Sequence, residues 1–199
     1  MKRSLSGVVL AAGRSSRMGR DKALLEVDGV PLWERQRAVL AAAGAAEILL
    51  SARPGQAWTQ RAAGFAGVVH DALTGGGPLV GATAALERAA HPWLAVLAID
   101  LPALPVAWFA TLLAECAPGV GAIGRREGRF EPLAAVYPRE FKWLAWETLA
   151  RGERAFQPVA ERAVAAGLLR VREIAPAEAG WFANWNSPED LPAPEGGAA

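Results

Sequence analysis

Short apolar runs alternate along the chain with longer segments whose apolar residues recur at helical spacing. A nearly continuous apolar run is typical of a buried strand, whereas helical recurrence predicts an amphipathic helix. The runs predict strands at residues 8–12, 47–52, 68–70, 93–99, 119–124, 133–137 and 169–174. The recurrent segments predict helices at residues 31–43, 54–63, 79–90, 105–115, 141–149 and 157–166. Residues 23–27 are expected to be extended and to turn at Asp28-Gly29.

This alternation predicts an α/β protein with three α/β/α layers and a mainly parallel, Rossmann-like mixed sheet. In such sheets, ligands bind where the strands end at their carboxyl termini. The loop at residues 13–22, Asp71 and Asp100 each follow a predicted strand directly. We therefore expect these three features to gather at one edge of the sheet.

Length and composition narrow the class of protein. The 199 residues, 52% of them apolar, fit a single domain at residues 1–191, and the Pro/Gly/Ala-rich tail at 192–199 is expected to be disordered. A net charge of +1 speaks against a nucleic-acid partner. No apolar run approaches the length of about 18 residues that a membrane span requires, so no membrane partner is expected. The single cysteine, Cys116, is consistent with a cytoplasmic location.

The loop that follows the first predicted strand has the composition of a phosphate site. It combines glycine and serine with several cations, among them Arg17 and Lys22. Small residues let backbone N–H groups approach phosphate oxygens, and the cations supply the charge. The loop matches neither the Walker A pattern nor the three-glycine dinucleotide fingerprint. A tight turn is the alternative interpretation of such a glycine-containing loop.

Asp100 is the strongest candidate for a metal ligand. It ends the most apolar predicted strand, at residues 93–99, where a buried carboxylate needs a partner. Mg²⁺ prefers one or two carboxylates together with phosphate oxygens and water. The alternative is an aspartate that caps or turns into the helix near Pro105. Asp71 follows a weaker strand, and there the two interpretations are evenly balanced.

Two further segments carry alternative interpretations. Gly75 to Gly81 is either a flexible connection or a helix N-terminus that lets a flat ring approach the backbone. Arg125, Arg126 and Arg129 form a basic cluster between two predicted strands. This cluster is either a solvated hairpin tip or a site for a second anionic substrate.

Four motifs resemble one enzyme family. The segment from Leu10 to Lys22 resembles the signature loop of the nucleotidyltransferases that share the nucleotide-diphospho-sugar transferase fold. Gly77-Pro78-Leu79-Val80-Gly81 is similar to the Gly-Pro-Leu-x-Gly motif of molybdenum cofactor guanylyltransferases. Glu131 to Tyr137 resembles their mid-chain strand, and Asn184 to Leu191 resembles their closing Asn-x-Asn-Thr-Pro-Glu-Asp-Leu segment. The resemblance extends from about Gly7 to Leu191.

The resemblance implies a reaction in which GMP passes from GTP to molybdopterin cofactor, with Mg²⁺ as the metal. It implies catalytic roles for Arg17, Lys22 and Asp100, with Asp100 as the metal ligand. The residues that it places against GTP are Leu10, Ala11, Ala12, Gly13, Lys22 and Asp71. It places Asn184 and Asn186 on the pterin or metal side. Transient contacts with molybdenum-insertion proteins or target apoenzymes are also implied.

Two positions depart from the family pattern. Ala12 stands where the family loop usually has glycine, and Leu-Ala-Ala-Gly is found in other branches, including molybdopterin cytidylyltransferases. The choice of base therefore stays open between GTP and CTP, with a sugar-phosphate nucleotidyltransferase as a related alternative. A non-catalytic nucleotide-binding protein is the alternative from a different class. Arg53 stands where the family tends to carry an asparagine, so that contact is not transferred.

Overall fold

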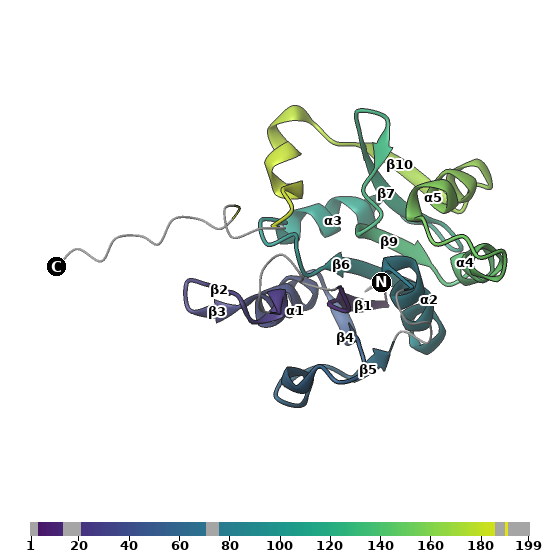
Figure 1. The fold of residues 1–199 in the computed structure, drawn as a ribbon. Coiled ribbons are helices and arrows are strands. Elements are labelled where there is room, and N and C mark those ends of the chain that lie inside the picture. Colours follow the sequence, from purple (N-terminus) through teal and green to yellow (C-terminus); the bar gives the residue numbers. More distant parts are fainter. Residues whose placement is uncertain (1–3, 14–20, 71–75, 186–189, 191–199) are drawn as a thin grey trace.

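The computed structural model describes residues 4–13, 21–70, 76–185 and 190. Its main sheet has the strand order β10-β7-β9-β6-β1-β4-β5, and β8 pairs with the outer part of β7 (Figure 1). The strands of this sheet are β1 (Leu5–Leu10), β4 (Ala45–Ala52), β5 (Gly67–His70), β6 (Trp93–Ala98), β7 (Gly121–Arg126), β8 (Arg129–Phe130), β9 (Ala134–Pro138) and β10 (Leu169–Glu173). The most apolar run, β6, lies in the middle of this order.

Strand direction confirms the prediction of a mainly parallel, mixed sheet. The pairs β1–β4, β1–β6, β4–β5 and β7–β10 are parallel. In contrast, β9 runs antiparallel to both of its neighbours, β6 and β7. The amino end of β9 therefore reaches the edge where the parallel strands have their carboxyl ends.

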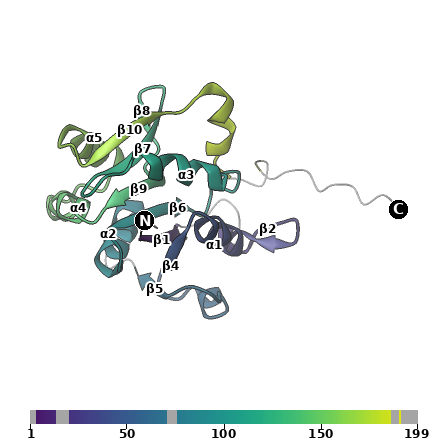
Figure 2. The same cartoon turned by 180° about the vertical axis from the view of Figure 1, so that it is seen from behind.

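Helices cover both faces of the sheet, which confirms the three-layer architecture (Figure 2). On one face lie α1 (Leu32–Ala42) and α3 (Val106–Glu115), and on the other lie α2 (Pro78–Arg88), α4 (Phe141–Ala150) and α5 (Phe156–Ala165). Alternating side chains of β1 feed the two cores: Leu5 and Val9 pack on the α1 side, and Val8 packs on the α2 side. A Cβ at Gly7 would lie 3.2 Å from Leu40, so glycine allows α1 to approach β1 closely.

Short elements differ most from the sequence expectations. The segment at residues 23–27 divides into η1 (Lys22–Leu24) and β2 (Glu26–Val27), which pairs with β3 (Val30–Pro31). Helical structure within 54–63 is limited to the 3-10 helix η2 (Ala57–Gln60), because Pro54, Gly55 and Gly64 interrupt the segment. A further 3-10 helix, η3 (Pro176–Phe182), was not predicted, since its sequence has no apolar periodicity.

The polar excursion at residues 125–131 forms a hairpin. Arg125 pairs with Phe130 and Arg126 pairs with Arg129, so β8 continues the sheet for two residues. Glu127 and Gly128 make the turn with φ values of 50° and 77°. Positive φ at both central residues is what a type I′ two-residue hairpin turn requires. Within the described part of the chain, no helix is both long and apolar enough to span a membrane.

Candidate active site

Lys22 and Asp100 meet at the carboxyl edge of the sheet. Lys22 begins η1 after the loop that follows β1, and Asp100 lies two residues beyond the end of β6. The Lys22 Nζ lies 3.8 Å from the Asp100 Oδ2, and the two side chains are 14% and 24% exposed. Of the cationic loop, Lys22 is therefore found beside this carboxylate, as expected.

Asp100 is a carboxylate whose hydrogen-bonding capacity is not filled. Burial raises the pKa of the Asp100 carboxyl, and the nearby Lys22 ammonium partly offsets this effect. The Asp100 Oδ1 is buried and has no hydrogen-bond partner among the described residues. A desolvated carboxylate oxygen of this kind favours a bound cation. Asp100 is not the cap of the next helix, because α3 begins at Val106 with Pro105 as its N-cap, but it does lie in the turn at residues 99–100.

Hydrogen bonds to backbone carbonyl groups hold the Asp100 turn in place. The buried Gln36 side chain on α1 donates to the carbonyl oxygens of Ala98 (3.1 Å) and Leu101 (2.8 Å). The Ile99 N–H donates to the Leu10 carbonyl at 3.1 Å, which ties the turn to β1. Asp100 is thus oriented by contacts on both sides of it in the chain.

A second aspartate, Asp21, makes several hydrogen bonds near the end of the loop at residues 13–22. Its Oδ1 accepts from the Ala23 N–H at 3.1 Å, and its Oδ2 accepts from Gln56 Nε2 at 2.6 Å and Trp58 Nε1 at 2.9 Å. Gln56 also donates to the Ala11 carbonyl at 3.2 Å. The Asp21 side chain therefore connects η1 to the segment after β4.

Sequence reasoning missed this network. Gln56 and Trp58 lie 35 and 37 residues from Asp21, and no motif links the three positions. They do follow β4 at the carboxyl edge, and that placement was the available signal. Arg53, which departs from the family pattern, also belongs to the network: its Nη2 lies 3.8 Å from the Asp21 Oδ2, and its N–H donates to Gln56 Oε1.

The predicted backbone contacts at residues 10–13 divide into two groups. The Leu10 carbonyl accepts from Ile99, and the Ala11 N–H donates to the Ser51 carbonyl at 2.8 Å, so both residues are held within the sheet. Ala12 and Gly13 lie beyond the end of β1, at the edge where Asp100 stands. The described geometry thus favours Ala12 and Gly13 as the residues that approach a ligand.

The C-terminal segment reaches the same edge by way of η3. Arg172 on β10 donates to both carboxylate oxygens of Glu178 at 2.8 Å, and Phe182 packs edge-on against Trp108 at 4.9 Å between ring centroids. The Trp185 N–H then donates to the Asp100 carbonyl at 3.0 Å. Asn184, exposed and adjacent to Trp185, is thereby brought next to the Asp100 turn. The predicted site residues Arg17, Asp71 and Asn186 lie outside the described residues.

The donor set around Asp100 suits a metal that also binds substrate. Among the described residues, no cluster of three or more His, Cys, Asp or Glu side chains could hold a metal alone. Mg²⁺ commonly binds one or two carboxylates and completes its shell with phosphate oxygens and water. The buried, unpartnered Asp100 Oδ1 fits such a shared site.

Comparison with known proteins places the chain in a class of enzymes. Residues 7–168 match the family described as the MobA-like NTP transferase domain, so the chain belongs to that family and is a nucleotidyltransferase. Enzymes of this family generally use a divalent metal.

Individual relatives carry a more specific name. The chain is 44% identical over 191 residues, covering 94% of its own length and 93% of the relative, to a probable molybdenum cofactor guanylyltransferase of Opitutus terrae. A protein of the same name from Deinococcus radiodurans is 35% identical over 202 residues, covering 94% and 92% of the two chains.

A solved structure supports the fold. Molybdopterin-guanine dinucleotide biosynthesis protein A from Archaeoglobus fulgidus has a TM-score of 0.72 at 23% identity, covering 93% of this chain and 94% of that one. The family resemblance and the fold class expected from the sequence are both confirmed.

Proposed function

We propose that this enzyme transfers GMP from GTP to molybdopterin cofactor and releases pyrophosphate. The names of the full-length relatives support this assignment. The structural observation that carries it is the Lys22–Asp100 pair, with a 3.8 Å separation and a buried Asp100 oxygen that lacks a hydrogen-bond partner in the described chain. A cation beside an unfilled carboxylate is the arrangement that a metal-bound triphosphate requires.

The reaction needs little covalent help from the protein. A terminal phosphate oxygen of the acceptor forms a bond to the α-phosphorus of GTP, and the bond from that phosphorus to the bridging oxygen of pyrophosphate breaks. Positioning and charge neutralisation supply most of the acceleration in such transfers. Lys22 neutralises phosphate charge as a compact, rotatable cation. Arg17, outside the described residues, is proposed to act with it.

Asp100 is proposed to hold the metal, and Mg²⁺ is the ion that the chemistry favours. When bound, Mg²⁺ neutralises phosphate oxygens and fixes their orientation. The hydrogen bonds from the Gln36 side chain and the Ile99 N–H hold the backbone on both sides of Asp100. Ala12, Gly13 and Asp71, which lies outside the described residues, are proposed to contact the nucleotide, and Asn184 and Asn186 the pterin side.

Pyrophosphate release tests the proposal. Purified protein, GTP and molybdopterin cofactor with Mg²⁺ should release pyrophosphate and form the guanine dinucleotide. Omission of either substrate is the control. Absence of release with both substrates present would refute guanylyl transfer.

Cytidylyl transfer is kept as a second candidate because of Ala12, which matches the loop of cytidylyltransferases. Labelled GTP in competition with CTP, ATP and UTP separates the two. Preferential incorporation of labelled GTP supports the proposal, whereas preferential use of CTP supports the second candidate.

Three wider expectations accompany the proposed reaction. Residues 1–191 are proposed to act as one domain, of which the family match covers 7–168. The enzyme is proposed to work in the cytoplasm, where its single cysteine, Cys116, stays reduced. Transient contact with molybdenum-insertion proteins or target apoenzymes would deliver the product.

A further inference from the structure

The β7–β8 hairpin carries arginines on both of its faces. Arg125 and its partner Phe130 face α5: Phe130 is buried in the core on that side, and the Arg125 side chain donates to Glu173 on β10. Successive residues of a strand point to opposite faces. Arg126 and its pairing partner Arg129 therefore face the other way, toward α3 and η3.

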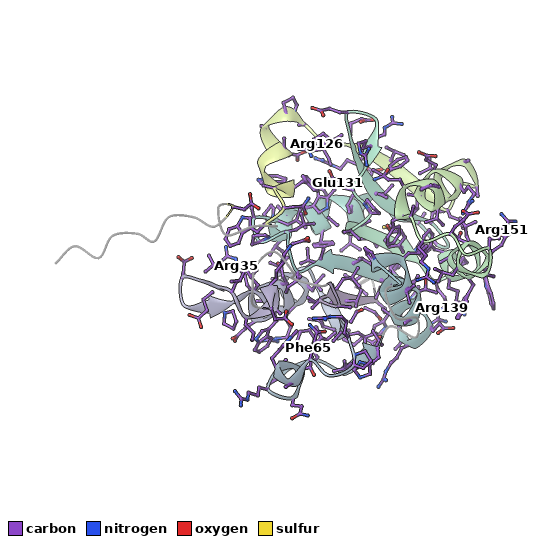
Figure 3. The ribbon with its side chains drawn as sticks, viewed as in Figure 1. Arg35, Phe65, Arg126, Glu131, Arg139 and Arg151 are labelled. Atoms are coloured by element: carbon purple, nitrogen blue, oxygen red, sulfur yellow. The ribbon has the colours of Figure 1, made fainter. Side chains whose placement is uncertain are left out.

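Contacts on that second face confirm the direction of Arg126. Its Nη1 donates to the Ala179 carbonyl on η3 at 3.5 Å, and its Nη2 lies 3.5 Å from Glu131 Oε1. Figure 3 shows the Arg126 and Glu131 side chains beside the hairpin, on the side of η3. Arg126, Arg129 and Glu131 thus form a cluster of two cations and one anion, here called the hairpin cluster.

The hairpin cluster lies at the carboxyl edge of the sheet, on the opposite side of Asp100 from Lys22. Glu131 comes three residues before β9 begins, and the Ala98 N–H at the end of β6 donates to the Leu133 carbonyl at 2.9 Å. In the strand order β9-β6-β1, Asp100 follows the middle strand, and the Lys22 loop follows β1. The strand order therefore puts the hairpin cluster and Lys22 on opposite sides of Asp100 along this edge.

This arrangement matches what a nucleotidyl transfer needs. The attacking phosphate and the leaving pyrophosphate lie on opposite sides of the α-phosphorus, so cations on both sides can position the two reacting groups. Arginine binds phosphate through two parallel N–H donors. Glu131 neutralises only one of the two guanidinium groups on its face, which leaves the hairpin cluster with a net positive charge.

The carboxylate of the hairpin cluster is more buried than the one that pairs with Arg125, whereas Arg126 and Arg125 are similarly exposed, at 38% and 41%. The Glu131 side chain is only 22% exposed, compared with 63% for Glu173, the partner of Arg125. Burial raises the pKa of Glu131, and Arg126 and Arg129 partly offset that increase. Two arginines are thus held beside a partly desolvated carboxylate, facing the segment that leads to Asn184.

We propose that Arg126 and Arg129 bind the terminal phosphate of the acceptor, with Glu131 holding Arg126 in position. This inference rests on the proposed function, because the acceptor phosphate is the nucleophile of that reaction. It assigns a phosphate monoester as the ligand of the hairpin cluster and leaves the nucleotide triphosphate to the Lys22 side. Arg125 has no part in the site.

The test compares the acceptor and donor kinetics of Arg126→Ala, Arg129→Ala and their double variant. Pyrophosphate release is measured with molybdopterin cofactor varied at saturating GTP, and then with GTP varied. Loss of one charge-assisted hydrogen bond predicts that the acceptor KM rises about 10- to 100-fold for each single variant. The KM for GTP should change by less than about threefold, since the triphosphate lies on the other side of Asp100.

Arg125→Ala is the matched control, because it removes the same type of side chain from the neighbouring position on the opposite face. It should leave both KM values unchanged. Arg129→Ala guards against a folding defect, since Arg129 is exposed, and thermal unfolding checks each variant. An unchanged acceptor KM in the double variant, or equal rises in both KM values, would overturn the proposal.

Equilibrium dialysis with molybdopterin separates this inference from the proposed function. Acceptor binding that is lost in the double variant supports the hairpin site even if the wild-type protein does not use GTP. Acceptor binding that the double variant retains refutes the site even if guanylyl transfer is confirmed. A wild-type protein that binds no acceptor would overturn both.

Discussion

Asp21 and Asp100 stand at the same edge of one sheet, yet their surroundings differ. Asp21 accepts three hydrogen bonds from Ala23, Gln56 and Trp58. Asp100 lies 3.8 Å from the Lys22 ammonium and keeps one buried oxygen that no described residue contacts by a hydrogen bond. The protein itself satisfies the hydrogen-bonding capacity of Asp21, whereas Asp100 keeps an oxygen that is available to a ligand such as a cation.

The number of hydrogen bonds that the protein donates to a carboxylate distinguishes a structural carboxylate from a functional one. A carboxylate that the fold has already satisfied gains little from a metal, and its removal leaves buried donors without a partner. A carboxylate that burial has made costly is stabilised when a cation arrives. Asp21 should therefore matter mainly for stability, and Asp100 mainly for turnover.

Asp100→Asn tests the larger half of this contrast. Because it removes the charge that would hold the metal, turnover should fall by about 100- to 1,000-fold. The free energy of unfolding should change little, because relief of the carboxylate's desolvation offsets the loss of its ion pair with Lys22. Pyrophosphate release and urea unfolding measure the two effects. Turnover close to that of the wild-type protein would remove Asp100 from the metal site.

Lys22→Ala tests the cation that accompanies Asp100. Loss of a compact charge beside the triphosphate should lower turnover by about 100-fold. Lys22→Arg keeps the charge but changes its shape, so its turnover should lie between that of Lys22→Ala and that of the wild-type protein. Lys142→Ala on α4, where the half-buried Lys142 lies over the Trp143 ring, is the control and should have the turnover of the wild-type protein. Equal turnover in Lys22→Ala and the control would contradict the assignment.

Asp21→Ala tests the structural half. The buried Gln56 amide and the Trp58 indole would lose their acceptor, so the free energy of unfolding should fall by about 2–3 kcal/mol. The exposed Asp28 provides a control, because its ion pair to Arg35 spans 3.9 Å at the surface. Asp28→Asn should change the free energy of unfolding by less than about 0.5 kcal/mol. Equal free energies of unfolding, measured with urea, for Asp21→Ala and Asp28→Asn would contradict a structural role for Asp21.

Glu178→Gln tests the support of the C-terminal segment and is expected to have the smallest effect. The hydrogen bonds from Arg172 hold the pKa of Glu178 below its ordinary value of 4.5, against the opposing effect of burial. A lowered carboxyl pKa contributes stability above the unfolded-state pKa, and this contribution is lost as the pH falls through the folded-state value. The variant should be about 1 kcal/mol less stable at pH 7.

Urea unfolding between pH 7 and about pH 3 measures this effect. The difference between wild-type protein and Glu178→Gln should shrink as the pH falls below 4.5. A difference that stays constant across this range would mean that the Arg172–Glu178 pair does not support η3.

Much of the site was predictable because it depends on local pattern and strand direction. Apolar runs located β1 and β6, and the parallel arrangement of these strands brings the residues that follow them to one edge. That rule was sufficient to bring Lys22 and Asp100 together without knowledge of any contact. The β2–β3 turn was likewise predictable from the residue pair Asp28-Gly29. In the structure both residues take positive φ.

The remainder depends on contacts between distant parts of the chain. The acceptors and donors of the Asp21 network are separated by loops that carry no periodic signal. The position of Asn184 depends on Arg172 and Phe182, which hold η3 through an ion pair and a ring contact. The β8 strand is two residues long and depends on its turn, so apolar patterning could not reveal it.

Metal binding at Asp100 is the most direct test of the central claim. Mn²⁺ can be titrated in the presence of GTP into wild-type protein, Asp100→Asn and the control Asp28→Asn, with water-proton relaxation reporting the protein-bound ion. Loss of the relaxation enhancement in Asp100→Asn alone is the predicted result. An equal enhancement in all three proteins would contradict the account, because the metal would then be held without the Asp100 carboxylate.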